Sequence, residues 1–566
     1  MTKPSVSHSA TAATAAAAAS PRQTAKGGGF RATWLYRQLL RGPAPRGVTL
    51  DVPVLWPGAP EQGAALLDGR FTFKGESHHL NAANLPPLEA SAEWLAWFHG
   101  LAWLSDLAAL SGGGHGGEAP YFAREWISAW MDANTHYSPI AWAPEVTAER
   151  VINLIRSWTF LVRDDAAGAF EKMLRHTIGR DVRHISKSPP PPGSGYPRLH
   201  TFVGQAYAAL ALSGRERCIP KTLARLEQEI DAQVLPDGGH VERNPERLAD
   251  VLRDLLELKA LIAAATGQMS GCVQNAIDRA APMLRQLRHP DGGLALFNGA
   301  QEGEAAAIDL LLAHTDPGAT APGRAPYMGF QRLNSANVAV IMDCGAPGGT
   351  GPSIGSRHHA GTLSFEMSVG AKRVIVNCGA RAGASDPWRG ALAATAAHST
   401  LTVNDTSSAA FTLDGALHRG PEHVTCTRTD ASDTGEGALV EASHDGYLAA
   451  FGLIHHRALF VGPAGDDVRG EDRLTGTGGE YYTIRFHLHP DVKASLLGEG
   501  AGALLRFGAR HKETWRLRAS AGEVKLEDSV YLGRVGEHRR TEQIIITGPL
   551  TGNGALVKWA LTRVDH

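Results

Sequence analysis

The chain has 566 residues, too many for one hydrophobic core, so at least two domains are expected. Hydrophobic residues make up 43% and charged residues 20%, which are ordinary values for a globular protein. The formal net charge of -2 excludes a general basic field that would hold nucleic acid or an anionic membrane. A local basic groove for an acidic polymer is still compatible with this balance.

The N-terminal residues 1–29 are predicted to be a disordered tail. The stretch Ser9–Ser20 is mainly Ala and Thr, and only Lys3 precedes it, whereas a secretory signal needs a strongly apolar centre. A weak export signal is the alternative. No run of 18 or more strongly apolar residues occurs, so no membrane span is expected and a cytoplasmic location is favoured.

The cysteines do not form a recognisable framework. They are five in number, scattered, and include no C-x-x-C pair. This argues against a set of disulfides or a cysteine zinc site, and is typical of small buried side chains in a reducing compartment. The cysteines are Cys218, Cys272, Cys344, Cys378 and Cys426.

Residues 30–318 are predicted to be helical, because apolar residues recur there at spacings of three and four. The proline run in Ser188–Gly195 interrupts the series as a loop. No clean repeat is visible, so a closed toroid of helical hairpins is favoured over a regular solenoid. The predicted helices are Trp34–Leu40, Ala92–Leu110, Tyr121–Ala133, Ala148–Val162, Phe170–Ser186, Leu199–Leu212, Lys221–Val234, Pro245–Ala265 and Val273–Arg288.

The pattern changes after the Pro/Gly-rich linker Ala319–Arg324. Residues 325–566 contain short β-branched or alternating runs bounded by Gly, Asp and Asn, which is typical of an antiparallel β-sandwich. The expected fold is therefore a multidomain α+β protein, an (α/α) toroid followed by a large sandwich. The predicted strands are Asn337–Asp343, Thr362–Ser368, Lys372–Asn377, Ser399–Asn404, His455–Val461, Tyr481–Leu488, Thr514–Ala519, Lys525–Leu532 and Glu542–Thr547.

An ordered set of motifs over most of residues 230–490 resembles the heparinase II/III-like polysaccharide lyases. The resemblance implies a toroid-plus-sandwich fold and β-elimination on a uronic-acid, glycosaminoglycan-like polysaccharide. It also makes a periplasmic or cell-envelope location in a bacterium the alternative to the cytoplasm, and leaves a homodimer open. The motifs are Asp237–Pro245, His359–Glu366, Arg373–Gly379, Ala397–Asn404, His444–Tyr447, His455–Arg457 and Phe486–Pro490.

β-Elimination needs a group that neutralises the uronate carboxylate, a base for the C5 proton and an acid for the leaving oxygen. The resemblance implies that a cleft between toroid and sandwich supplies these groups. The catalytic candidates are His240, Asn244, Tyr447 and His358, and the substrate-binding candidates are Glu242, Arg243, Arg247, Arg357 and His200. A capping role for Asn244 and a packing role for Tyr447 are the structural alternatives.

The sequence departs from the family at one point. Active relatives carry a Tyr-His pair after the Asn-Pro step, whereas this chain has Arg247 and Leu248 there. A guanidinium stays protonated and cannot act as a base, although it can bind a carboxylate. We therefore keep a second hypothesis, a non-catalytic glycan-binding or envelope-polymer protein, and a structural alternative in which Arg247 pairs with Asp250. A glycoside hydrolase is a third hypothesis, but nothing marks its pair of carboxylates.

A metal site is the last candidate. Metal-containing relatives hold zinc with a His, an Asp and a His, and the matching positions here are His359, Asn377 and His398. Neutral Asn is a poor zinc ligand compared with a carboxylate. The alternative to zinc is a hydrogen-bonded polar cluster, and in either case we expect the three side chains to lie together.

Overall fold

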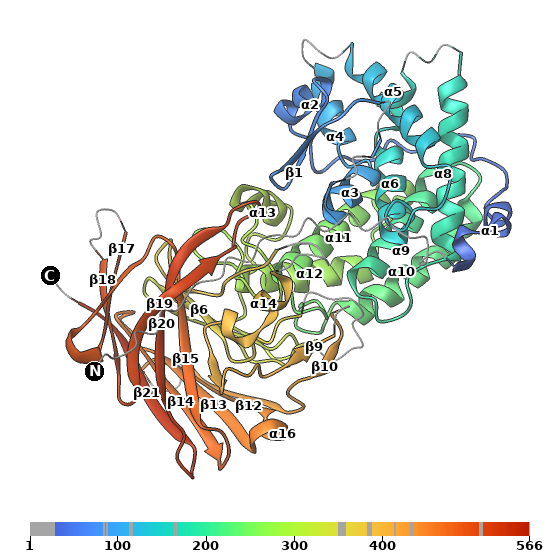
Figure 1. The fold of residues 1–566 in the computed structure, drawn as a ribbon. Helices are drawn as coiled ribbons and strands as arrows, with labels where there is room; N and C mark the ends of the chain where they lie inside the picture. The colour runs from blue at the N-terminus through green and yellow to red at the C-terminus, as the bar shows by residue number, and fades with distance from the viewer. Residues whose placement is uncertain are drawn as a thin grey trace, which may run out of the picture.

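The computed structural model describes residues 29–564, apart from 83–84, 87–88, 113–116, 164, 166, 349–357, 382–387, 413–414, 431–434 and 509–512. The chain folds into a helical N-terminal part and a C-terminal sandwich of strands (Figure 1). The predicted fold class, an (α/α) toroid followed by an antiparallel β-sandwich, is therefore confirmed. The predicted tail lies outside the described residues except for Gly29.

The helical part is built around α9, which packs against α6, α8, α10 and α11. Proline at the first turn starts many of these helices, since its fixed φ suits the helix and its missing N–H would have no partner there. The helices are α1 (Trp34–Leu39), α2 (Pro60–Leu67), α3 (Ala92–His99), α4 (Leu104–Ala108), α5 (Ala119–Ala133), α6 (Pro144–Arg156), α7 (Trp158–Val162), α8 (Ala169–Lys187), α9 (Tyr196–Ala211), α10 (Ile219–Gln233), α11 (Pro245–Thr266), α12 (Gly271–Gln286) and α13 (Ala305–Ala313).

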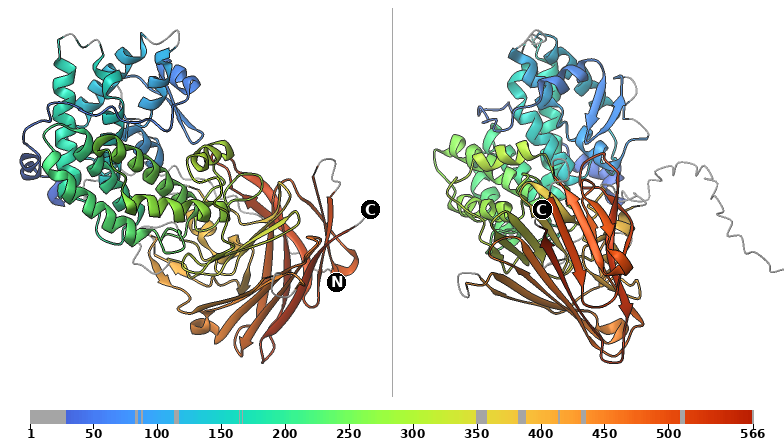
Figure 2. Two further views of the ribbon diagram at one scale, coloured as in Figure 1. Left: turned by 180° about the vertical axis from the view of Figure 1, so that it is seen from behind. Right: turned by 90° about the vertical axis from the view of Figure 1, so that its left-hand side faces the viewer.

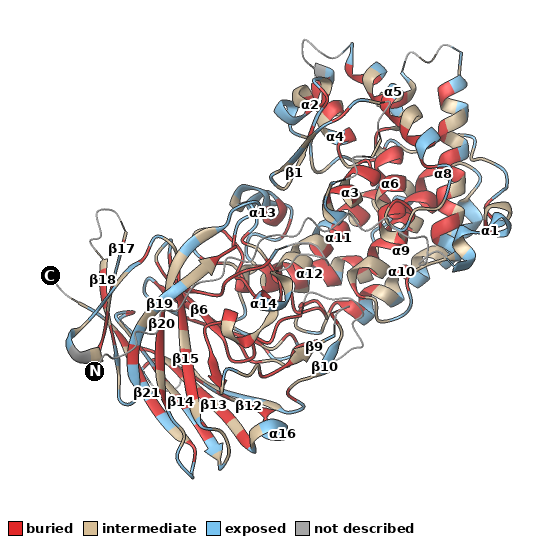
Figure 3. Cartoon of the chain, in the orientation of Figure 1, coloured by how far each residue is buried: buried red, intermediate tan, exposed pale blue. Residues whose placement is uncertain are grey.

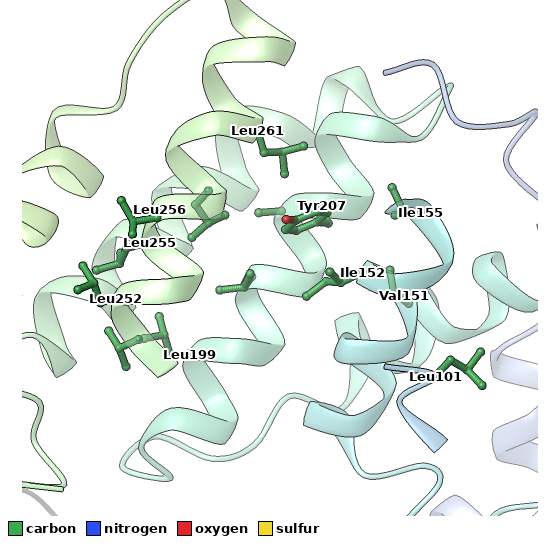
Figure 4. Packing of buried hydrophobic residues seen from close by; sticks show 14 of the residues in the cluster. Leu101, Val151, Ile152, Ile155, Leu199, Tyr207, Leu252, Leu255, Leu256 and Leu261 are labelled. Carbon is green, nitrogen blue, oxygen red and sulfur yellow. The ribbon is translucent and has the colours of Figure 1, made fainter. Parts of the chain in front are cut away.

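The core of this part is apolar and continuous. Figure 4 shows Ile152 of α6, Leu199 and Tyr207 of α9, and Leu252 and Leu255 of α11 lying between the same helices. All five are fully buried. Each such side chain contributes about 1.5–3 kcal/mol on burial, so the packed faces of α6, α9 and α11 hold the helices together.

A β-hairpin that the helical pattern did not predict, β1 (Arg70–Phe73) with β2 (Glu76–His79), packs on α2 and α3. Its Phe71 is fully buried and contacts Phe98 and Trp103 edge to face at 5.6 Å. Trp94 is also fully buried. Trp94 and Trp103 therefore belong to the core, as expected for aromatic residues at helical spacing.

The sandwich consists of a nine-stranded and an eight-stranded sheet. The nine-stranded sheet contains β3 (Arg324–Ala325), β4 (Phe330–Ser335), β5 (Val338–Asp343), β6 (Phe365–Val369), β7 (Lys372–Val376), β8 (Leu401–Val403), β15 (Tyr481–Leu488), β19 (Glu523–Tyr531) and β20 (Arg539–Pro549). The eight-stranded sheet contains β11 (Val424–Thr429), β12 (Ala438–Tyr447), β13 (Leu453–Val461), β14 (Asp467–Gly476), β16 (Lys493–Leu496), β17 (Gly502–Phe507), β18 (Glu513–Ala519) and β21 (Ala555–Arg563).

The nine-stranded sheet is covered on both faces around β4 and β5. Side chains alternate between the faces of a strand, so Phe330 and Ile341 join the helical core, whereas Val340 and Met342 join the core between the sheets. This is why all of β5 is buried. Figure 3 shows the buried residues of the helices and strands in red. The helical part and the sandwich therefore share an apolar contact at β4 and β5, and Figure 2 shows the two parts from two further sides.

Within the described residues, no helix is long and apolar enough to cross a membrane.

Candidate functional site

The loop between α10 and α11 carries most of the predicted site residues. It ends at Asn244, whose side chain accepts a hydrogen bond from the Arg247 backbone N–H at 2.9 Å and so caps α11. The Asn244 amide also donates to the Asn298 carbonyl at 2.7 Å. Because Asn244 is buried and both ends of its amide are bonded, the structure corrects its expected catalytic role to a capping role.

His240 lies in the same loop and is fully buried. Its Nε2 shares a hydrogen bond of 2.8 Å with the Gln233 side chain. Burial lowers the pKa of His240 to about 4, so the ring is neutral at pH 7. A neutral ring could accept a proton, but this one has no exposed surface on which to meet a sugar, which argues against the catalytic role expected for it.

Arg243 connects the loop to the sandwich instead of facing a substrate. Its guanidinium donates to the Met328 and Ala346 carbonyls at 2.7 Å each and forms a buried ion pair with Asp343. It also stacks over the Phe330 ring, 5.0 Å from the centroid. Its backbone φ of 53° lies in the left-handed region. The predicted substrate-binding role of Arg243 is therefore corrected to a structural one.

Arg247, at the position of the missing tyrosine, is held by carboxylates. Its Nη1 donates to Asp250 at 2.6 Å, its Nε lies 3.8 Å from Glu242, and its guanidinium stacks over Tyr196 at 4.8 Å. The pairing with Asp250 is the contact that the structural alternative for Arg247 expected. Burial alone would lower the pKa of Arg247, but Asp250 and Glu242 raise it above its ordinary value, so the cation is permanent. Glu242 also accepts a hydrogen bond from the Tyr196 backbone N–H at 2.7 Å.

His200 lies next to this group, between two acids from different helices. Its Nε2 is 2.9 Å from Glu149 of α6, and its Nδ1 is 2.9 Å from Asp254 of α11. Burial alone would lower the pKa of His200. Asp254 and Glu149 together have the larger effect and raise this pKa to about 10. Burial likewise raises the pKa of Glu149, and His200 brings it down to about 2. His200 is therefore an imidazolium at neutral pH and cannot serve as a base.

The charges around Tyr196 and His200 do not favour an acidic ligand. Four carboxyl groups, those of Glu149, Glu242, Asp250 and Asp254, surround the two cations of His200 and Arg247. Burial, followed by Asp254 and Asp250, raises the pKa of the Tyr196 hydroxyl well above 10. We call these six charged side chains together with Tyr196 the polar cluster. It therefore has neither surplus positive charge nor a tyrosinate. Its members are Glu149, Tyr196, His200, Glu242, Arg247, Asp250 and Asp254.

The sandwich contributes one predicted residue to this neighbourhood. His358 is buried, and burial lowers its pKa to about 4, while the charges of Glu242 and Arg243 act on it in opposite directions. The charges of the loop residues Glu242 and Arg243 therefore act on His358 of the sandwich. Arg357 lies outside the described residues.

Tyr447 is not part of this neighbourhood. It is fully buried in the core of the sandwich, and its hydroxyl donates to the Leu401 carbonyl at 2.8 Å. Burial raises the pKa of Tyr447 above its ordinary value. The structure corrects the expected catalytic role of Tyr447: it is the packing tyrosine of the alternative, because a bonded hydroxyl inside an apolar core cannot reach a substrate.

The structure does not support a complete metal site at the three positions inherited from the family. His359 and His398 contact each other, with 3.1 Å between Nδ1 and Nε2. The Asn377 amide is used differently: it donates to the Leu296 carbonyl at 3.2 Å and accepts from the Ser399 N–H at 3.0 Å. No group of three His, Cys, Asp or Glu in the described part of the chain could hold a metal ion. These residues therefore fit a hydrogen-bonded polar cluster better than a zinc ion.

The comparisons with known proteins agree with this fold. Residues 317–560 match the family described as heparinase II/III-like, C-terminal. Among solved structures, heparinase III aligns with a TM-score of 0.69 and 14% identity over 94% of this chain and 89% of that one. The sandwich of this chain is therefore a heparinase II/III-like C-terminal domain. The heparan sulfate lyase HepC of Pedobacter heparinus, as a mutant, aligns with a TM-score of 0.62 and 15% identity over 89% of this chain and 83% of that one. At such identities the solved structures show the fold of this chain and nothing more.

A further relative is not named as a lyase. The FtsZ-localized protein C of Caulobacter vibrioides (strain NA1000 / CB15N) is 29% identical over 546 residues, which cover 92% of this chain and 91% of that protein. The similarity thus extends through both the helical part and the sandwich of this chain.

Sequence reasoning identified His200 but missed its partners Glu149 and Asp254. No local spacing connects them, because the three residues lie on α6, α9 and α11 and are about 50 positions apart along the chain. The only available signal was the set of acidic residues on otherwise apolar helical faces, which is weak by itself.

Proposed function

We propose that this protein does not catalyse β-elimination and works by binding, at sites in the cell where FtsZ assembles. The observation that carries the first part is Arg247. It occupies the position of the missing tyrosine as a permanent cation paired with Asp250 and Glu242, so it offers no proton acceptor.

The groups around Arg247 support the same conclusion. A uronate lyase has to neutralise the substrate carboxylate, yet the cations of His200 and Arg247 are already neutralised by their own carboxylates. The surrounding acids would repel an acidic polymer instead of attracting it. A hydroxyl such as that of Tyr196, with a pKa well above 10, removes protons poorly at neutral pH.

The proposal about location rests on the Caulobacter relative. That protein is named for localisation with FtsZ, and its similarity covers both parts of this chain. A protein that has lost a catalytic group but kept the whole fold is suited to a binding role, since the fold still presents the same surfaces.

Two experiments test the two parts separately. The first is a lyase assay on a panel of uronate polymers, read by the ultraviolet absorbance of the unsaturated product, and we expect no signal. The second is imaging of a fluorescent fusion of the full chain together with labelled FtsZ, before and after FtsZ depletion. Diffuse fluorescence that does not coincide with FtsZ would refute the proposed location. Formation of unsaturated elimination products would refute the proposed loss of catalysis.

A lyase that uses a different base is the second candidate, because of His358. Burial lowers the pKa of His358 to about 4, as it does for His240, so both rings are neutral at pH 7. His240 is fully buried, whereas His358 keeps an exposed fraction of 5% through which it could meet a substrate. On this hypothesis, His358→Gln would abolish elimination activity, whereas Tyr447→Phe would leave it unchanged.

A further inference from the structure

Two cysteines from different sheets meet at one edge of the sandwich. Cys344 directly follows β5 in the nine-stranded sheet, and Cys426 lies in β11, the edge strand of the eight-stranded sheet. Cys344 is buried, whereas Cys426 is exposed. They are 82 positions apart in the sequence, so only the fold brings them together.

The strand register explains why they are neighbours. Cys344 donates its backbone N–H to the Gly329 carbonyl at 2.7 Å, and Gln331 pairs with Met342 on the adjacent strand. Because side chains alternate, Gln331 and Cys344 are diagonal neighbours on the face that looks toward the other sheet. Gly329, directly opposite Cys344, has no side chain to cover the sulfur.

From the other sheet, β11 reaches the same place. Arg428 donates from Nη1 to the Gln331 side chain at 3.4 Å and to the Arg332 carbonyl at 2.9 Å. Cys426 lies two residues before Arg428 on the same strand, so its side chain is on the same face. Its cross-strand partner Ala442 and Cys344 both belong to the core between the sheets, so the Cys426 side chain points toward the face that carries Cys344. The electrostatic interactions of the Cys426 thiol with Gln331 and with the thiol of Cys344 agree with this placement.

The surroundings make the two thiols unequal. The hydrogen bond from Cys344 lowers the pKa of Cys426, and Arg428 and Arg324 lower it further although burial opposes them. The hydrogen bond to Cys426 and burial raise the pKa of Cys344 well above its ordinary value. One partner is therefore an exposed thiol inclined to ionise, and the other is a protected thiol beside it, which is the arrangement of a reactive and a resolving cysteine.

We propose that Cys426 and Cys344 are a peroxide-sensitive pair that closes reversibly into a disulfide between the two sheets. In the first step the Cys426 thiolate attacks hydrogen peroxide: an S–O bond forms, the O–O bond breaks, and the departing hydroxide takes a proton to become water. In the second step the Cys344 sulfur attacks the Cys426 sulfenic acid. An S–S bond forms, the S–O bond breaks, and hydroxide leaves with the Cys344 proton as a second water. Two thiols are thus oxidised by two electrons, peroxide is reduced, and a dithiol reverses the reaction.

The bridge would act on the contact between sandwich and helices. Cys344 lies between Asp343, which pairs with Arg243, and Gly345, whose N–H donates to Asp343. Closing the disulfide fixes the edge strand β11 against this segment. We expect the oxidised protein to melt at a higher temperature and to exchange the amide hydrogens of β11 more slowly than the reduced protein.

The test uses the full chain, reduced and then treated with hydrogen peroxide, blocked with an alkylating reagent and analysed by intact and peptide mass spectrometry. The expected result is a loss of two hydrogens, a cross-linked peptide pair containing Cys344 and Cys426, and full reversal by dithiothreitol. The Cys218→Ser/Cys272→Ser double variant is the matched control, because it removes two cysteines outside the pair and should form the bridge as readily.

Cys426→Ser and Cys344→Ser should each abolish the cross-link, and Cys344→Ser should instead trap Cys426 as a sulfenic acid that dimedone labels. The proposal is overturned if wild-type Cys426 is oxidised to sulfinic acid while Cys344 stays reduced, if the bridge joins Cys218 of two copies, or if neither thiol changes under conditions that oxidise free cysteine. The wild-type measurement decides this even if a serine variant fails to fold.

Discussion

Replacing Arg243 with methionine should uncouple the helical part from the sandwich. The substitution keeps most of the side-chain volume but removes the ion pair with Asp343 and the hydrogen bonds to the Met328 and Ala346 carbonyls. The side chains of Arg243 and Asp343 are each only 3% exposed, so water can replace little of what is lost. Breaking a buried pair on one side costs about 3–5 kcal/mol, and we expect a loss of this size.

The assay is urea unfolding followed by tryptophan fluorescence, with Arg247→Met as the matched control. Arg247 also pairs with a carboxylate, but its side chain is 23% exposed and that of Asp250 is 37% exposed, so the control should lose about 1 kcal/mol or less. Burial already raises the pKa of Asp343, and without Arg243 it should rise further. The destabilisation should therefore be smaller at low pH, where the stranded carboxyl is protonated, than at high pH.

The reasoning would be refuted if Arg243→Met lost no more stability than Arg247→Met. A double variant, Arg243→Met with Asp343→Leu, gives a second check, because it leaves no buried charge behind. The double variant should recover part of the lost unfolding free energy, because the effect of Arg243→Met alone comes largely from the unpaired Asp343 carboxylate.

Three other predictions concern buried polar groups. The pKa of His200 is raised from 6.5 to about 10, so its pairing stabilises the protein fully below about pH 6.5 and loses this effect as the pH rises toward 10. His200→Gln should therefore lower the unfolding free energy by on the order of 3–5 kcal/mol at pH 6 and by much less at pH 10. A difference in unfolding free energy that does not change with pH would contradict this. Burial raises the pKa of Glu366 to about 7. As the pH rises from about 4.5 to 7, the wild type should therefore lose unfolding free energy relative to Glu366→Gln. A difference in unfolding free energy that stays constant over that pH range would contradict this. Tyr447→Phe should cost about 1 kcal/mol in unfolding free energy through the hydrogen bond to Leu401, and no loss would mean that this bond has no net value.

Much of the fold could be predicted from periodicity, because long amphipathic segments bury one face in a way that local sequence determines. The helices from Phe170–Ser186 to Val273–Arg288 correspond closely to α8 through α12. The predicted helix Ala92–Leu110 is in fact two, since Leu101 adopts a left-handed φ of 56° between α3 and α4. The hairpin β1–β2 was missed because its burial depends on helices that follow it.

The site was harder to predict, because burial and pairing depend on distant elements. The sequence identified the substitution at Arg247 and the cap at Asn244, both of which depend on neighbouring residues. It could not show that Arg243 pairs with Asp343, 100 positions away, or that Tyr447 lies inside the sandwich. The resemblance to lyases supplied roles for these residues, but only their three-dimensional contacts show which side chains are already occupied.

The apolar contact at β4 and β5 has a consequence for how such a protein can evolve and be divided. Phe330 and Ile341 lie beyond the linker in sequence, yet they belong to the same packed core as the leucines of α11. A cut at the linker would expose that surface on both fragments, so neither half is expected to remain soluble alone. The joint also does not depend on position 247, where the side chain is partly exposed. A lineage could therefore exchange a reactive residue there for an inert one while natural selection continued to preserve the joined scaffold.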